Sequence, residues 1–178
     1  MMVNFDIQLN NDLSAYELDD KVIETVEANM RDSIDITALE EAVYRFSELY
    51  WNNLWHIDVG DYSKSFHIYY ILFLWDEIPS FLRAIIDGQE SHLYLEEGPE
   101  NTCLRAIPKD EGLIEVLLNK GAEGASSSHL VKRANFVLSW VGFAETLFDL
   151  IEQAGLLDPT DDLLSQYMNS LRRLVSSL

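Results

Sequence analysis

Hydrophobic and polar positions in the first third of the chain predict a strand followed by two helices. Apolar residues at alternate positions over 3–9 predict a short strand. A capping box over 14–17 precedes apolar residues at helical spacing, so we expect a helix over about 14–30. A further helix is expected from Asp35, because apolar residues again recur at helical spacing as far as Leu54.

The most apolar stretch is FHIYYILFLW at 66–75, in which His67 is the one polar residue. A membrane-spanning helix needs about 20 apolar residues, but an Asp-Glu pair at 76–77 ends this run, so we do not expect a membrane span. The run is long for a strand and lacks Val and Thr, which favours a buried helix. We therefore expect a central helix over about 61–75, followed by a short helix over 78–87.

The second half of the chain changes period twice. Short apolar segments separated by Gly-Pro and Pro-Lys-Asp-Glu-Gly predict an antiparallel β-meander over about 92–118. The small polar residues of 119–128 predict a flexible loop. Helical spacing returns over 131–151 as far as Gly155, and Thr160 begins a last helix.

Composition agrees with a single globular domain over 1–178. Hydrophobic residues make up 48% of the chain, which places it outside the disordered class. A chain of this length buries roughly two thirds of its unfolded surface. We expect an α+β fold that is predominantly helical, as a compact helical bundle around the buried 61–75 helix with the small β-meander.

The formal net charge of −19 restricts the kinds of partner. Residues 1–63 hold 14 Asp and Glu against 3 Lys and Arg, so most of the charge lies early in the chain. An acidic surface repels nucleic-acid backbones and anionic membranes, so we expect neither as a partner. It would attract a basic protein, although acidity can also serve solubility alone.

Residues that could take part in catalysis or bind a metal do not form a recognisable motif. The histidines lie too far apart in sequence for a short metal motif, so we expect no metal site and no cofactor. Cys103 is the only cysteine, which suits a reducing compartment, and the first residues do not resemble a secretory signal. We therefore expect a cytoplasmic protein without an assembled catalytic set.

Aromatic residues are concentrated in one part of the sequence. Twelve of the 20 aromatic residues lie over 44–81, where a core could absorb many of them. Aromatic side chains bordered by acids are also typical of binding hot spots. Our hypothesis for such a partner-binding surface comprises Glu48, Tyr50, Trp51, Trp55 and Asp58.

Three hypotheses of function remain open from the sequence. The first is a non-enzymatic acidic protein that occludes a basic partner, as an inhibitor, antitoxin or immunity protein would. The second is a small-molecule-binding protein or enzyme with an aromatic-lined pocket, in which His56, His67 or His92 supplies polarity. The third is a homodimer that buries the apolar 66–75 helix across its interface.

Overall fold

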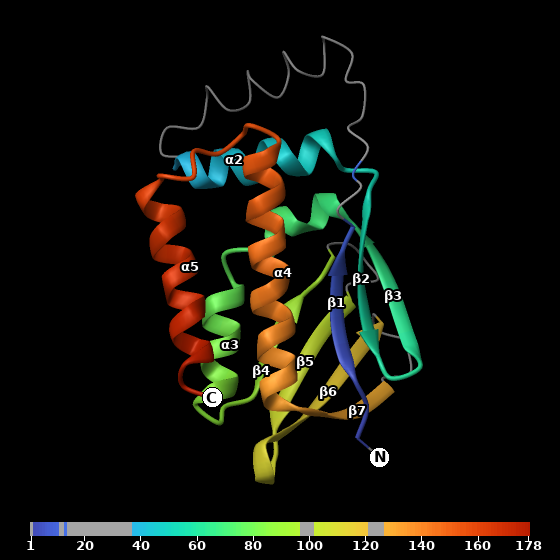
Figure 1. Cartoon of the computed structure of the whole chain (residues 1–178). Coiled ribbons are helices and arrows are strands. Elements are labelled where there is room, and N and C mark those ends of the chain that lie inside the picture. Colours follow the sequence, from blue (N-terminus) through green and yellow to red (C-terminus); the bar gives the residue numbers. More distant parts are fainter. Residues whose placement is uncertain (1, 11–12, 14–36, 97–101, 121–126) are drawn as a thin grey trace.

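The structure is a computed structural model that describes residues 2–10, 13, 37–96, 102–120 and 127–178. In these residues, seven strands form two antiparallel sheets, and helices pack against them (Figure 1). The fold is therefore α+β.

The first sheet has three strands in the order β1-β2-β3. These are β1 (Phe5–Leu9), β2 (Leu54–Val59) and β3 (Tyr62–His67). Gly60 and Asp61 join β2 to β3, and Gly60 has the φ angle of 63° that the first position of a type II′ hairpin turn requires. Alternate residues of β2 are buried, so one face of the sheet lies against the core and the other faces outward.

The second sheet has four strands in the order β4-β5-β6-β7. These are β4 (Ser91–Tyr94), β5 (Thr102–Pro108), β6 (Leu113–Lys120) and β7 (Ser127–Lys132), with a short 3₁₀ turn, η2 (Asp110–Gly112), between β5 and β6. The backbone N–H of Val3 donates to the carbonyl oxygen of Leu130 (2.8 Å). The chain just before β1 therefore lies alongside β7, and the two sheets meet at this corner (Figure 1).

A long, largely buried helix lies at the centre of the molecule. The helices of the described chain are α2 (Ala38–Leu49), the 3₁₀ helix η1 (Ile68–Phe73), α3 (Ile78–Ile86), α4 (Arg133–Gln153) and α5 (Asp162–Val175). Of these, α4 has 21 residues, ten of which are buried. It packs against β1 and β7 on one side and against α3 and α5 on the other (Figure 1). A remaining stripe of its surface, which includes Leu138 (49% exposed), faces outward.

The expectation of a predominantly helical bundle around a 61–75 helix is wrong. Residues 62–67 form β3, and the following residues form only the 3₁₀ helix η1. The ring of Phe66 stacks on that of Trp55 in the neighbouring strand, with centroids 4.6 Å apart. This pairing between strands, rather than a helical period, determines which residues are buried. The central buried helix is α4.

Several local predictions are confirmed. The strand expected over 3–9 is β1, the short helix over 78–87 is α3, and the two C-terminal helices are α4 and α5. The predicted meander contributes three of the four strands in the second sheet. Its fourth strand, β7, begins inside the predicted 119–128 loop, whose middle lies outside the described residues. The helix predicted over 14–30 also lies outside them.

Candidate functional site

The five residues of the predicted partner-binding surface do not lie together. Trp55 is completely buried (0% exposed) on the inner face of β2. Its indole Nε1 donates to the carbonyl oxygen of His67 (3.2 Å), and its ring contacts Phe143 of α4, with centroids 5.2 Å apart. Trp55 is a core residue, so the expectation that it contacts a partner is wrong.

Glu48 and Tyr50 lie at the end of α2 and are half-buried. Burial raises the pKa of the Glu48 carboxyl. The ring of Tyr50 packs against that of Phe46 in the core, with centroids 4.8 Å apart. These two side chains can border a binding surface but do not form its centre.

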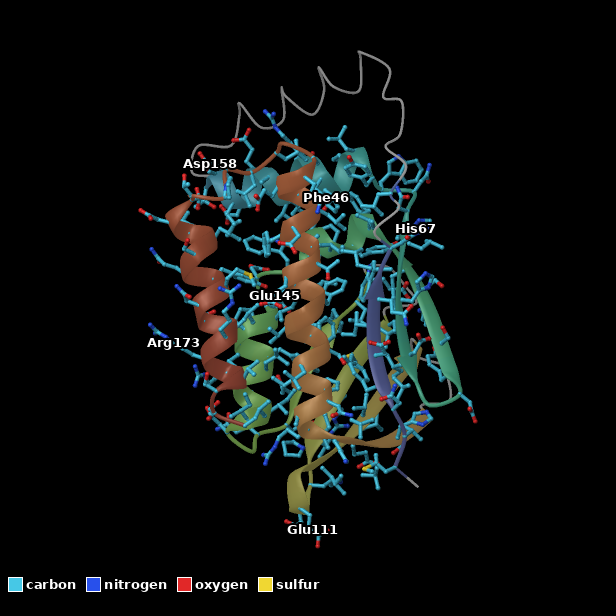
Figure 2. All side chains as sticks on the ribbon, viewed as in Figure 1. Phe46, His67, Glu111, Glu145, Asp158 and Arg173 are labelled. Carbon is cyan, nitrogen blue, oxygen red and sulfur yellow. The ribbon has the colours of Figure 1, made fainter. Side chains whose placement is uncertain are left out.

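The outward face of the three-stranded sheet brings together residues from both predicted sets. We call this surface the acidic sheet face; it consists of Asp6, Gln8, Leu54, His56, Asp58, Ser63, Ser65 and His67. Trp51 (41% exposed) lies at one end beside His67, with ring centroids 6.5 Å apart, and Leu54 is 37% exposed. Figure 2 shows His67 at the outer side of this sheet. The face therefore combines an apolar end with a carboxylate-bearing end.

Two carboxylates lie directly opposite each other on this face. Asp6 of β1 pairs in register with Asp58 of β2, and like charges directly opposite destabilise an antiparallel pair. The Asp6 carboxylate accepts hydrogen bonds from the backbone N–H of Ile7 (2.9 Å) and from Gln8 Nε2 (3.0 Å). The only Lys or Arg in the three strands is Lys64, which alternation places on the inner face. The strand residues of the acidic sheet face thus include two histidines but no Lys or Arg.

The three histidines of the alternative pocket do not converge. His56 and His67 lie on the acidic sheet face, where His56 Nδ1 is 2.8 Å from the hydroxyl of Ser65. His92 belongs to β4 in the other sheet, and its ring meets that of Tyr94 edge-on, with centroids 5.4 Å apart. A cavity of about 320 Å³ is lined by His92, Glu77, Ser80, Phe81 and Ser91. Within the described ranges, no group of three or more His, Cys, Asp or Glu side chains could hold a metal ion.

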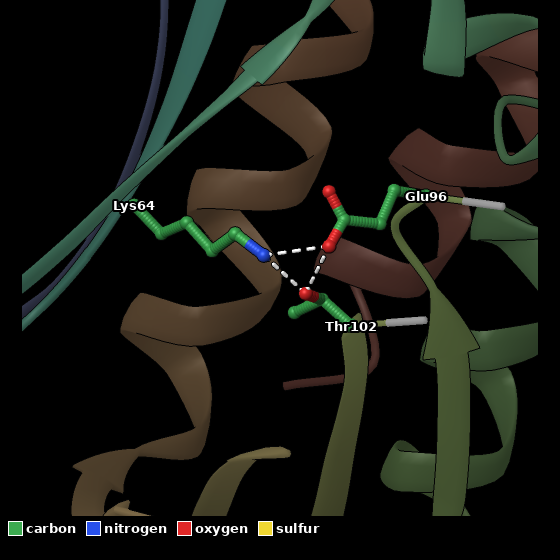
Figure 3. A network of polar contacts seen from close by, with 3 residues as sticks. All are labelled: Lys64, Glu96 and Thr102. Carbon is green, nitrogen blue, oxygen red and sulfur yellow. Dashed lines mark hydrogen bonds and ion pairs between the residues drawn. The ribbon is translucent and has the colours of Figure 1, made fainter. Parts of the chain in front are cut away.

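A polar network that the sequence did not reveal joins the two sheets. Lys64 Nζ of β3 lies 2.7 Å from Glu96 Oε1, and both side chains hydrogen-bond to the hydroxyl of Thr102 (Figure 3). Glu96 follows β4 and Thr102 begins β5, so the contacts cross from one sheet to the other. Burial, and then the charge of Glu96, raises the pKa of Tyr62, which is on the same face of β3 as Lys64.

The chemistry of this network is structural. A lysine beside a threonine hydroxyl could in principle activate a nucleophile. Here the Lys64 ammonium has Glu96 as its counter-ion, and an ammonium has no lone pair to accept the Thr102 proton. Thr102 is also completely buried (0% exposed), out of reach of a substrate. The network therefore holds β3 against β4 and β5.

Comparison of the chain with models of known protein families, with curated proteins and with solved structures finds no match. In the part of the chain that the structure describes, α4 alone is long and apolar enough to cross a membrane, and 56% of its apolar window is buried inside the protein. The core helix of a globular protein meets the same criteria.

Proposed function

We propose that this protein is a non-enzymatic binding protein whose acidic sheet face occludes a basic protein partner, as an inhibitor, antitoxin or immunity protein would. The observation that carries the proposal is the pair formed by Asp6 and Asp58, opposed on adjacent strands with no Lys or Arg among the strand residues of their face. A Lys or Arg of a partner placed between them would replace repulsion with charge-assisted hydrogen bonds. The net charge of −19 would steer such a partner toward the chain.

Trp51 and Leu54 supply the apolar part of the proposed interface. Both are exposed at the end of the acidic sheet face, next to His67. Binding hot spots commonly combine an aromatic anchor with charges that select the partner. Binding would cover the cationic side chains with which the partner contacts its own substrate. Inhibition by occlusion needs no catalytic residue on this chain.

The test is affinity capture from a lysate of the native host, with the wild-type chain and two charge-reversal variants. Asp58→Lys reverses one of the opposed carboxylates, whereas Asp149→Lys reverses an exposed carboxylate of α4 and serves as the matched control. We expect one basic protein to be retained by the wild type and the control, released by salt, and lost with Asp58→Lys. A captured protein that is acidic, or that Asp58→Lys retains equally well, would contradict the proposal.

The cavity beside His92 supports a second candidate, a small-molecule-binding protein or enzyme. It brings a histidine and the carboxylate of Glu77 to one site with the ring of Phe81. Under this hypothesis a small-molecule library should contain a compound that raises the melting temperature of the wild type. The increase should disappear in His92→Ala and persist in His56→Ala, and an increase that both variants retain would exclude this cavity.

The homodimer hypothesis stays a prediction, although much of the 66–75 segment is covered within a single chain. Ile68, Ile71 and Leu74 are completely buried (0% exposed) within a single chain. Tyr69, Tyr70, Leu72 and Phe73 of the same segment are only half-buried.

A further inference from the structure

The three-stranded sheet has two edges that differ in their backbone hydrogen bonds. At the β1 edge, the N–H of Val3 donates to the carbonyl oxygen of Leu130, and the hydroxyl of Ser139 on α4 donates to the carbonyl oxygen of Phe5 (3.2 Å). Residues of β7 and α4 therefore close this edge.

The β3 edge has outward-pointing backbone groups. The N–H of Ile68 donates to the carbonyl oxygen of Asn53 (2.8 Å), so these two opposite residues form a hydrogen-bonded pair. This pair shows which of the following residue pairs between β2 and β3 are hydrogen-bonded. Bonded and non-bonded pairs alternate in an antiparallel ladder, so even-numbered residues of β3 bond to β2 and odd-numbered ones point away. The backbone groups of Ser63 and Ser65 consequently point outward, and within the described ranges no backbone partner meets them.

We propose that this edge accepts an extended, basic segment of the partner as a fourth strand of the sheet. The inference rests on the proposed function and specifies how the partner binds. Addition of a strand to an open edge is a common mode of peptide recognition, in which backbone hydrogen bonds supply affinity and alternate side chains supply specificity.

Charge on the neighbouring residues specifies the chemistry of the added strand. The side chain of Ser63 lies on the acidic sheet face, in register with Asp58, and Asp61 is in the adjoining turn. A side chain on the same face of an added strand would lie two strand spacings, about 10 Å, from the backbone of Asp58. A Lys or Arg can span that distance to the carboxylate. An extended segment that places a basic side chain opposite Ser63 therefore fits this edge.

Charge also argues against a second copy of the chain as the occupant. Antiparallel pairing of β3 with β3 of another copy would bring together two acidic faces of chains that each carry a net charge of −19. The same face attracts a basic strand.

The experiment uses the full chain and two short peptides of alternating Lys and Thr. One peptide is N-methylated at alternate residues, so that one edge of the peptide strand cannot donate backbone hydrogen bonds. Hydrogen exchange of the Ser63 and Ser65 amides is measured by nuclear magnetic resonance at low salt. We expect the unmodified peptide to slow this exchange by about 10-fold or more, and the N-methylated peptide to bind more weakly without slowing it.

A pair of variants tests the same edge from the protein side. Ser63→Pro removes an amide N–H that β2 does not use, and edge strands tolerate proline at such positions; Ser63→Thr is the matched control. We expect peptide binding to weaken in Ser63→Pro and to be retained in Ser63→Thr.

The outcomes separate the edge from the acidic face. If both peptides bind equally, exchange is unchanged and Asp58→Lys abolishes binding, the edge inference is wrong and the proposed function stands. If neither peptide binds the wild type at low salt, both are wrong. Protection of Ser63 and Ser65 that grows with protein concentration without peptide would identify a second copy as the occupant and overturn the inference.

Discussion

Replacing Lys64 by Met removes the ammonium that joins the two sheets while keeping a side chain of similar length. The side chains of Lys64 and Glu96 are each 20% exposed, and Thr102 between them is completely buried. The change therefore leaves Glu96 with one fewer charged partner in a site that water reaches poorly. We expect Lys64→Met to destabilise the fold.

The degree of burial sets the expected magnitude. Exposed ion pairs contribute about 1 kcal/mol or less, whereas loss of one partner from a fully buried pair costs about 3–5 kcal/mol. A pair with one fifth of each side chain exposed falls between these limits, so we expect a loss of about 2 kcal/mol in the free energy of unfolding. For a chain of this size that corresponds to a decrease of about 4–8 °C in melting temperature.

The assay is urea denaturation of the wild type, Lys64→Met, Glu96→Gln and the double variant. Because both single changes break the same contact, the double variant should lose less stability than the two single losses combined, by about 1 kcal/mol. Arg105→Met is the matched control, since it breaks an ion pair with Glu90 whose side chains are 43% and 48% exposed. Its cost should be clearly smaller than that of Lys64→Met, because solvent screens this pair.

Two results would refute the reasoning. The first is a cost for Lys64→Met no larger than that for Arg105→Met. The second is additivity of the two network variants within about 0.3 kcal/mol, which is expected of independent sites. Either result would mean that the network does not hold the two sheets together.

Three further changes test the helices. Tyr167→Phe removes the hydroxyl that donates to the carbonyl oxygen of Trp75 (2.6 Å) and should cost about 1–2 kcal/mol in urea denaturation, whereas a change within about 0.3 kcal/mol would contradict this. Thr37→Ala removes the cap of α2 and should cost about 1 kcal/mol. The backbone N–H of Thr37, and then its hydroxyl, lower the pKa of Glu40, and the alanine variant keeps the N–H. The part of the wild type's advantage that comes from the bond between the hydroxyl and the carboxylate should therefore fade as pH falls through the lowered pKa, and an advantage constant with pH would contradict this. Burial raises the pKa of Glu48, which opposes folding increasingly as pH rises through that pKa, so Glu48→Gln should melt higher at neutral pH, and an unchanged melting temperature would count against it.

The sequence predicts a helix correctly where apolar residues recur at helical spacing and a capping or terminating residue marks an end of the same segment. In α3 and α4 the apolar residues recur at helical spacing, and the glycine after each helix, Gly88 or Gly155, has a positive φ of 76° or 71°. In α5, Asp161 caps the first turn by accepting from the N–H groups of Leu163 and Leu164. These signals lie within a few residues of the elements that they define, so no knowledge of tertiary structure is needed.

The predicted helix from Asp35 to Leu54 is too long because a turn interrupts it. Trp51 and Trp55 are four residues apart and would share a face of a helix, but Asn52 and Asn53 between them are typical turn residues. The N–H and side chain of Asn53 both donate to the carbonyl oxygen of Tyr50, and the chain reverses there. One tryptophan is therefore exposed and the other buried.

The prediction of a helix over 66–75 is wrong for a different reason. A segment that is apolar at nearly every position carries no period, so its local pattern cannot distinguish helix from strand. The Gly60-Asp61 pair between two short segments favours a hairpin, and that signal could have corrected the assignment of the following residues. The choice is made by Trp55 of β2, which packs on Phe66.

The candidate site is less predictable than the fold because its residues meet through strand register. Alternation over 3–9 already implies that Asp6 points away from the core, but nothing local pairs it with Asp58. Lys64, Glu96 and Thr102 are likewise brought together by the arrangement of the two sheets. No spacing in the sequence marks these contacts.

The pairing of Asp6 with Asp58 favours the proposed recognition of a partner over solubility alone as an explanation of the acidity. Carboxylates that only keep a protein soluble can be spread over its surface, where they do not repel one another across a strand pair. Here two of them are opposed on adjacent strands, at a cost to the sheet, with no Lys or Arg among the strand residues of that face. Violations of local rules of this kind are expected where a site serves function. A cation supplied by a partner would relieve the repulsion and hydrogen-bond to both carboxylates. The opposed carboxylates that weaken the free sheet would then strengthen the complex.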